Sequence, residues 1–306
     1  MPPLRVVAAL GASLVVAAAL PPPAEATIFQ GQESANLFGN LNQADTACAN
    51  VACGPSAAVN SLVFLQKRYP NLYGNRLVPA ATKTTSEYQQ MVAVANSLGT
   101  NDYMNSCNCG TGTYIEEFIA GKQKYFNSVA PGTTSFDAQM TQNTWRQKPG
   151  GVNVGPKPSY VQLNTAPTAQ FLASQLKAGE DVELFINGSE GNHYVTLTQI
   201  YYDTNSATGN FIKVVDPNQP TSGGPAGPPT VTQLAINGLD PTDSDILLSG
   251  GLAYLGTGLN IVNAVAESPI PEPPALALGV LGIGVLGWMR RRWPPHDRRN
   301  VHATPA

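Results

Sequence analysis

The sequence is poor in charged residues and in histidine. Lys, Arg, Asp and Glu make up 12% of the 306 residues, about half of the roughly 25% that is usual for soluble domains. The formal net charge is only −3, which excludes a polycation that holds nucleic acid through its phosphates. Histidine occurs three times, and His296 and His302 lie close to the C-terminus. His193 is therefore the only imidazole of the central region, which excludes a site there with several histidine ligands on a metal.

The first residues have the order of a secretory signal peptide. Arg5 precedes a mostly apolar run over residues 6–20, and three prolines and a small-residue site ending at Ala26 follow. We predict that residues 1–26 are a signal peptide and that the mature protein is exported through the inner membrane. A retained signal anchor is the alternative, although the run is shorter than the roughly 20 residues that a spanning helix needs.

The C-terminal end combines three unlike features. Pro271-Glu272-Pro273 precedes an apolar stretch over residues 275–289, and Arg290-Arg291-Arg292 follows it. As a helix the stretch would rise about 23 Å, slightly less than a hydrocarbon core of about 30 Å. Arginines held at the cytoplasmic face would leave the preceding chain outside that membrane. The sequence predicts a linker at 267–274, a membrane helix at 275–289 and a basic cytoplasmic tail at 290–306.

This order of features resembles the PEP-CTERM sorting signal of Gram-negative bacteria, over about residues 270–292. The resemblance implies processing by an exosortase-type membrane protease and a transient membrane anchor. It also implies delivery to the cell surface or to an exopolysaccharide matrix. A plain tail anchor is the alternative.

Residues 27–266 are predicted to form one domain with helices first and strands later. Apolar residues recur at helical spacing from Cys53 to Pro70. The pattern change after Gly179 predicts an α+β fold with an antiparallel sheet. Further helices are expected at 86–97, 114–126 and 168–177, strands at 182–186, 193–202, 211–215, 230–236 and 252–265, and loops at 131–160 and 217–229.

Cys53 lies where a thiol can be activated. Pro55 suits the first turn of a helix, so the sulfur is expected at a helix N-terminus, whose free N–H groups and dipole stabilise a thiolate. A thiol nucleophile needs a base, and His193 is the candidate. The base needs an acceptor that holds its ring, and Asp216 follows the next predicted strand.

The strand register favours Asp216 as that acceptor. If Tyr201 pairs with Asn210 across the turn, Asp216 lies opposite Val195 and diagonal to the histidine. Asn218 then lies directly opposite the histidine and is the alternative. A slip of one residue would move both candidates to the wrong face. We prefer the carboxylate because it stabilises an imidazolium better than an amide does.

Three segments together resemble the papain-like cysteine peptidases, most closely the bacteriocin-processing peptidases and their exported relatives. They are Cys53-Gly54-Pro55-Ser56, Gly191-Asn192-His193-Tyr194-Val195 and Val214-Val215-Asp216-Pro217. The resemblance spans roughly residues 43–218. It implies a papain-like fold, in which a helix bearing the cysteine packs against an antiparallel sheet bearing the histidine and the aspartate. It also implies hydrolysis of a peptide or amide without a cofactor or metal.

Members of this family carry a glutamine about six residues before the nucleophile, and its amide donates to the developing oxyanion. Ala47 occupies that position here. Gln43 lies ten residues before Cys53 and fits the role if residues 48–52 form an inserted loop.

The remaining cysteines leave several alternatives open. Export favours disulfides, and we expect Cys48 to pair with Cys107 or Cys109. A bridge from Cys48 to Cys53 would silence the nucleophile or make it depend on redox state. Cys48 could itself be the nucleophile, since Gln43 lies five residues before it, but no Gly-Pro follows it. A zinc site has little support, because a single residue separates Cys107 from Cys109.

Two functions agree with these observations. The first is an exported, surface-sorted cysteine peptidase or related thiol amidohydrolase, with Cys53, His193 and Asp216 as triad and Gln43 in the oxyanion hole. The second is a non-catalytic protein on a decayed papain-like fold that binds exopolysaccharide or other surface proteins. Neither needs a cofactor.

Overall fold

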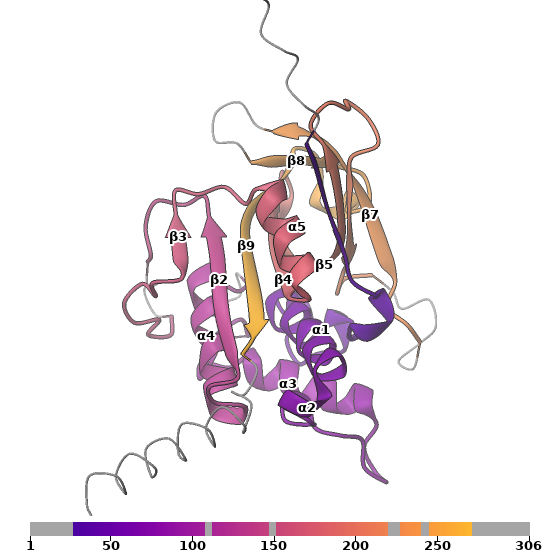
Figure 1. Cartoon of the computed structure of the whole chain (residues 1–306). Coiled ribbons are helices and arrows are strands. Elements are labelled where there is room, and N and C mark those ends of the chain that lie inside the picture. The colour runs from indigo at the N-terminus through magenta and orange to yellow at the C-terminus, as the bar shows by residue number, and fades with distance from the viewer. Residues whose placement is uncertain (1–26, 108–111, 147–150, 220–226, 240–244, 271–306) are drawn as a thin grey trace, which may run out of the picture.

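The computed structural model describes residues 27–107, 112–146, 151–219, 227–239 and 245–270 (Figure 1). The predicted signal peptide, membrane helix and basic tail lie outside these residues. Within them, no helix has both the length and the apolar character that crossing a membrane requires. The described chain has the mixed α+β fold predicted from the sequence, with a large and mostly antiparallel sheet.

The helices begin and end at residues with clear local preferences. Ser86 forms a capping box at the start of the third helix, Thr168 caps the fifth, and Gly179 ends that helix in the left-handed conformation. The four longer helices lie within three residues of their predicted bounds. The helices are α1 (Cys53–Arg68), α2 (Pro70–Tyr73), α3 (Glu87–Leu98), α4 (Ile115–Val129) and α5 (Ala169–Ala178), with short 3₁₀ turns η1 (Ala35–Leu37), η2 (Gln43–Asp45) and η4 (Ala253–Leu255).

Six strands of the sheet close into a ring, because β4 pairs with both β5 and β9 while β5 to β9 pair in sequence order. β1 pairs with β5 outside the ring, and β2 and β3 extend the sheet beyond β9. The strands are β1 (Ile28–Gln32), β2 (Thr134–Met140), β3 (Val161–Leu163), β4 (Asp181–Gly188), β5 (Gly191–Asp203), β6 (Phe211–Val215), β7 (Val231–Leu239), β8 (Ile246–Ser249) and β9 (Leu259–Pro269).

Two apolar cores hold these elements together. One joins alternate side chains of the ring strands with α5, and the other joins α1, α3 and α4 with the opposite face of the sheet. Figure 1 shows α1, α2 and α3 gathered at one end of the molecule and β7 and β8 at the other. Every residue of α1 from Gly54 to Leu65 is buried, as expected for a helix that is surrounded by other elements. The start of α1 is thereby fixed against β5.

Four strands, β1, β2, β3 and β8, were not predicted from the sequence. The loop predicted at 131–160 contains β2, whose sequence TSFDAQM has little β-branched character and is ordered by pairing with β9. The strand predicted at 252–265 begins only at Leu259, because Gly256 and Gly258 adopt φ of +80° and +66° and form a turn.

The domain also continues past its predicted end. The linker predicted at 267–274 starts within β9, which runs to Pro269. The carboxylate of Glu267 is fully buried, and its Oε2 lies 2.7 Å from Nζ of Lys122 on α4. This residue was predicted to begin the linker, whereas its pairing with a buried cation accounts for its place in the sheet.

Candidate active site

Cys53 is the first residue of α1, and its surroundings hold that end of the helix in place. The hydroxyl of Thr196 on β5 donates to the backbone oxygen of Ala57 at 3.2 Å. A Cβ atom on Gly54 would lie 2.6 Å from Oγ1 of Thr113, so this position accepts only glycine without a shift. The Cys-Gly-Pro motif thus lets the segment before α4 approach the sulfur closely, while the side chain of Cys53 stays partly exposed.

The structure brings the three predicted triad residues together. His193 lies near the start of β5, is 4% exposed, and places Nε2 2.8 Å from Oδ1 of Asp216. The imidazole of His193 also lies close enough to the thiol of Cys53 to act on the thiol pKa as a hydrogen-bond partner and as a charge. Because Asp216 occupies Nε2, the other ring nitrogen, Nδ1, is left for the sulfur. A thiol, an imidazole and a carboxylate therefore form one continuous chain of contacts.

A β-bulge decides that Asp216 reaches the histidine. The predicted partner of Tyr201 is wrong by one residue, because Tyr201 pairs with Phe211. The register then shifts by one between residues 197 and 199, and Thr196 pairs with Val215. This last pairing is the one that the predicted register required, so Asp216, the next residue, lies where the sequence analysis expected it.

The carboxylate of Asp216 is held by two donors besides the histidine. Oδ1 accepts the backbone N–H of Asn218 at 2.8 Å, and Oδ2 accepts the hydroxyl of Tyr254 at 2.9 Å. Asn218, the alternative orienter, thus supports the carboxylate through its backbone. The ring of Tyr254 packs edge-on to His193, with centroids 5.4 Å apart. Tyr254 was not among the predicted site residues, because η4 lies in a stretch predicted to be a strand.

The electrostatics of the site favour a negative charge on Cys53 and a positive charge on His193. Burial alone raises the pKa of the Cys53 thiol, but the hydrogen bond and charge of His193 and backbone hydrogen bonds from Tyr194 and Gly54 outweigh it, so the pKa is lowered. Burial alone lowers the pKa of His193, but its hydrogen bonds to Asp216 and Cys53 raise it to about 9. For Asp216, burial alone raises the pKa, but the hydrogen bond to His193 brings the pKa below its ordinary value. The shifts of Cys53 and His193 both favour the thiolate–imidazolium pair over the neutral pair.

Gln43 lies near the triad, but within the described residues its side chain forms no hydrogen bond with Cys53. Its backbone N–H donates to the oxygen of Pro217 at 2.8 Å, next to Asp216. Its side chain is 9% exposed, and the buried Oε1 has no hydrogen-bond partner. Residues 47–51 form turns between η2 and α1, and the role predicted for Gln43 requires an insertion in this segment.

The disulfide shows which of the predicted cysteine pairings forms and which cysteine stays free. Cys48 is bridged to Cys107, with Cα atoms 5.2 Å apart. Cys53 is the free cysteine of the described residues, so neither a Cys48–Cys53 bridge nor Cys48 as nucleophile agrees with the structure. Cys109 lies outside the described residues.

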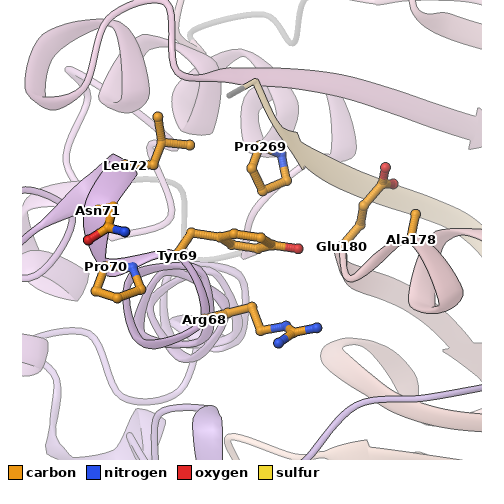
Figure 2. Close-up of a pocket in the computed structure, with 8 residues that line it drawn as sticks. All are labelled: Arg68, Tyr69, Pro70, Asn71, Leu72, Ala178, Glu180 and Pro269. Carbon is orange, nitrogen blue, oxygen red and sulfur yellow. The ribbon is translucent and has the colours of Figure 1, made fainter. Parts of the chain in front are cut away.

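A cavity of about 260 Å³ opens beside the sulfur. Its walls come from the segment that leads into α4, from β4 and β5 and from the end of β2, and include Cys53, Thr113, Ile115, Glu116, Phe185 and Tyr194. A larger cavity of about 540 Å³, shown in Figure 2, is lined by Arg68, Tyr69 and Glu180. It lies at the other end of α1, roughly 22 Å from the cysteine at 1.5 Å per residue, so it is not part of this site.

A second group of buried charges lies between α4 and the sheet. Lys122 contacts the carboxylates of Asp181, Glu183 and Glu267, and all four side chains are at most 1% exposed. The three carboxylates lie close enough together to hold a metal ion. The ammonium group of Lys122 already occupies that position, so we assign the group a structural role.

Comparisons with known proteins do not assign the site. No protein-family model matches the chain, and no curated protein is significantly similar to it.

Proposed function

We propose that this protein is an exported thiol hydrolase, most simply a cysteine peptidase on a papain-like fold. The observation that supports the proposal most is the chain of contacts from Cys53 through His193 to Asp216. A buried histidine with a raised pKa beside a partly exposed cysteine with a lowered pKa is the arrangement that a thiol nucleophile needs.

The proposed reaction proceeds in two halves. The thiolate of Cys53 attacks the carbonyl carbon of a peptide or amide, and the imidazolium of His193 gives its proton to the leaving amine. The resulting thioester is hydrolysed by a water molecule, whose proton goes to His193 and returns the site to its starting state. Asp216 holds the imidazole ring and stabilises its charged form.

Stabilisation of the oxyanion is assigned to two donors. The backbone N–H of Cys53 belongs to the first turn of α1, where N–H groups have no acceptor within the helix. The side-chain amide of Gln43 is the second proposed donor, as the resemblance to papain-like peptidases implies. Its position beside Pro217 supports this assignment, because Pro217 directly follows Asp216.

The site of action is proposed to be the cell surface or the exopolysaccharide matrix. The PEP-CTERM resemblance supports sorting by an exosortase-type protease, and the Cys48–Cys107 disulfide agrees with an oxidising compartment. Deletion of residues 271–292 should release the protein into the medium. Unchanged retention at the surface would contradict the sorting proposal.

Thiol labelling tests the hydrolase proposal directly. Full-length protein is treated with iodoacetamide without reductant, so that Cys48 and Cys107 stay bridged, and the label is located by peptide mass spectrometry. We expect Cys53 to react faster than a cysteine in a denatured sample, and Cys53→Ala to abolish both the label and peptide hydrolysis. An unlabelled Cys53, or full hydrolysis by Cys53→Ala, rejects the proposal.

A measurement of exopolysaccharide binding distinguishes the non-catalytic alternative. Binding of exopolysaccharide that persists in Cys53→Ala and His193→Ala, together with no hydrolysis of any peptide or amide by the wild type, would favour a matrix-binding protein over a hydrolase.

A further inference from the structure

The cavity beside Cys53 ends at a buried carboxylate. Glu116 is 4% exposed and lines the 260 Å³ cavity next to the sulfur. It also lines an adjoining cavity of about 430 Å³, together with Gln142 and Arg146. Because Glu116 and Gln142 belong to the walls of both cavities, the carboxylate lies at the point where they meet.

The two oxygens of Glu116 are used differently. Oε1 accepts Nε2 of Gln142 at 2.8 Å and the backbone N–H of Arg146 at 3.0 Å. Within the described residues Oε2 has no hydrogen-bond donor, and no cation lies within ion-pair distance of Glu116. The Nε of Arg146 donates to Thr144 instead. One oxygen is thus fixed by the protein, and the other is left for a ligand.

The helix dipole at Glu116 and the residues of the cavity walls indicate the charge and the shape of a ligand that would fit. Glu116 lies in the first turn of α4, where the helix dipole favours a negative charge. Between the carboxylate and the sulfur the walls include Ile115, Phe185 and Tyr194. Such walls suit an apolar stem that ends in a cation, and aromatic rings add attraction for the cation itself. The cavity is smaller than the 300–1,000 Å³ that is common for whole ligands, so it fits one side chain.

We propose that this cavity is a specificity site for a basic side chain, an arginine, a lysine or another ω-amine, on a residue that flanks the scissile bond. Glu116 pairs with the cation, while the aromatic walls hold the stem. The proposal rests on the hydrolase function proposed for Cys53. Oε2 of Glu116 is not among the fully enclosed unpaired oxygens, so it is open to the cavity, and a neutral side chain that displaced its water would leave the carboxylate charge unpaired, which is costly.

Matched peptides test the proposal. Fluorogenic peptides carry arginine or its neutral isostere citrulline on either side of the cleaved bond, and kcat/KM is measured for each. The wild type is expected to prefer arginine by roughly 10- to 100-fold at one of the two positions. Glu116→Gln keeps an acceptor for Gln142 and Arg146 but removes the charge, so this preference should disappear.

Glu117→Gln is the control variant. Glu117 is the next residue and is also buried; its Oε1 accepts from Asn105 and the backbone of Val152, its Oε2 is fully enclosed by protein, and the residue lines neither cavity. Its arginine preference should match that of the wild type. Equal use of arginine and citrulline by the wild type, or an unchanged preference in Glu116→Gln, would overturn the proposal.

A binding measurement separates this proposal from the hydrolase proposal. Nα-acetyl-arginine amide and Nα-acetyl-citrulline amide are titrated into Cys53→Ala, with and without Glu116→Gln. Tighter binding of the arginine compound that depends on Glu116 supports the specificity site even if no hydrolysis is seen. Hydrolysis of peptides without any such difference in binding rejects the specificity site and leaves the hydrolase proposal standing.

Discussion

Oδ1 of Asp216 lies 2.8 Å from Nε2 of His193, although a β-bulge and a turn separate the two residues along the sheet. The contact fixes the orientation of the imidazole ring before any substrate binds. It leaves Nδ1 on the side of Cys53, so the direction of proton transfer is set by the fold.

Asp216→Asn should retain the fold and lose most of the activity. The amide can hold the wrong ring tautomer and cannot stabilise the imidazolium, so we expect kcat/KM to fall by about 10² to 10⁴. The matched control is Asp203→Asn, at the far end of β5, where the carboxylate accepts the N–H of Asn205. A decrease of less than threefold for Asp216→Asn would argue against a triad.

The pH dependence of alkylation and hydrolysis should follow the titrations of Cys53 and His193. Because the pKa of Cys53 is lowered, alkylation by iodoacetamide should persist below pH 9.0, the ordinary pKa of the thiol. Hydrolysis should decline again as pH rises through about 9, where His193 loses its proton. In His193→Ala the hydrogen bond and the charge of the imidazole are lost, and burial is the largest remaining influence on the pKa of Cys53. The onset of alkylation should therefore move to higher pH. A profile that is identical in both proteins would contradict the ion pair.

The histidine should also make stability depend on pH. Its pKa is 6.5 in the unfolded chain and about 9 in the folded protein, so the folded state holds the proton more tightly. The resulting stabilisation is fully present below pH 6.5 and is lost as pH rises through about 9. Urea unfolding of the wild type and of His193→Gln should therefore differ more at pH 6 than at pH 10. The opposite trend would show that His193 is neutral in the folded state.

Tyr254 should act as a positioning residue. Tyr254→Phe keeps the edge-on ring but removes the donor to Oδ2 of Asp216. We expect kcat to fall about tenfold with little change in KM, because Tyr254 does not line the cavity beside Cys53. The carboxylate then keeps more negative charge for the imidazolium, so NMR should record a higher pKa for His193. Tyr201→Phe, on the same sheet, serves as control; a change confined to KM would reject this role.

The buried cluster around Lys122 should matter for stability. Lys122→Met leaves the carboxylates of Asp181, Glu183 and Glu267 without their cation, which should cost about 3–5 kcal/mol in the free energy of unfolding. Burial raises the pKa of all three carboxyls, so protonation at low pH should relieve part of the loss. Urea unfolding at pH 5 should show a smaller difference than at pH 8.

The control for that variant is Lys124→Met on the same helix, whose exposed ammonium donates to the backbone oxygen of Asp102 and lies over the ring of Tyr103. Its stability should stay within about 0.5 kcal/mol of the wild type. Equal losses for both lysines would show that the buried contacts contribute nothing specific.

Local sequence signals determined the elements that carry the triad. Pro55 and the helical spacing after Cys53 identified α1, and β-branched residues identified the strands of His193 and of the segment before Asp216. These signals depend on neighbouring residues, so they can be read along the chain. The strand at residues 134–140 lacked such a signal, because pairing with β9 supplies most of what orders it.

Only the tertiary structure revealed which residues lie around the triad and the cavity beside it. The bulge in β5 corrects a register that the turn alone would set wrongly, Tyr254 reaches Asp216 from a turn 38 positions away, and Glu116 meets the cavity from the start of α4. Each depends on packing between segments that are distant in sequence, and such contacts leave no periodic pattern in the chain. The sequence by itself determined which side chains could react, whereas the closure of the sheet and its packing against α1 and α4 decided which of them meet.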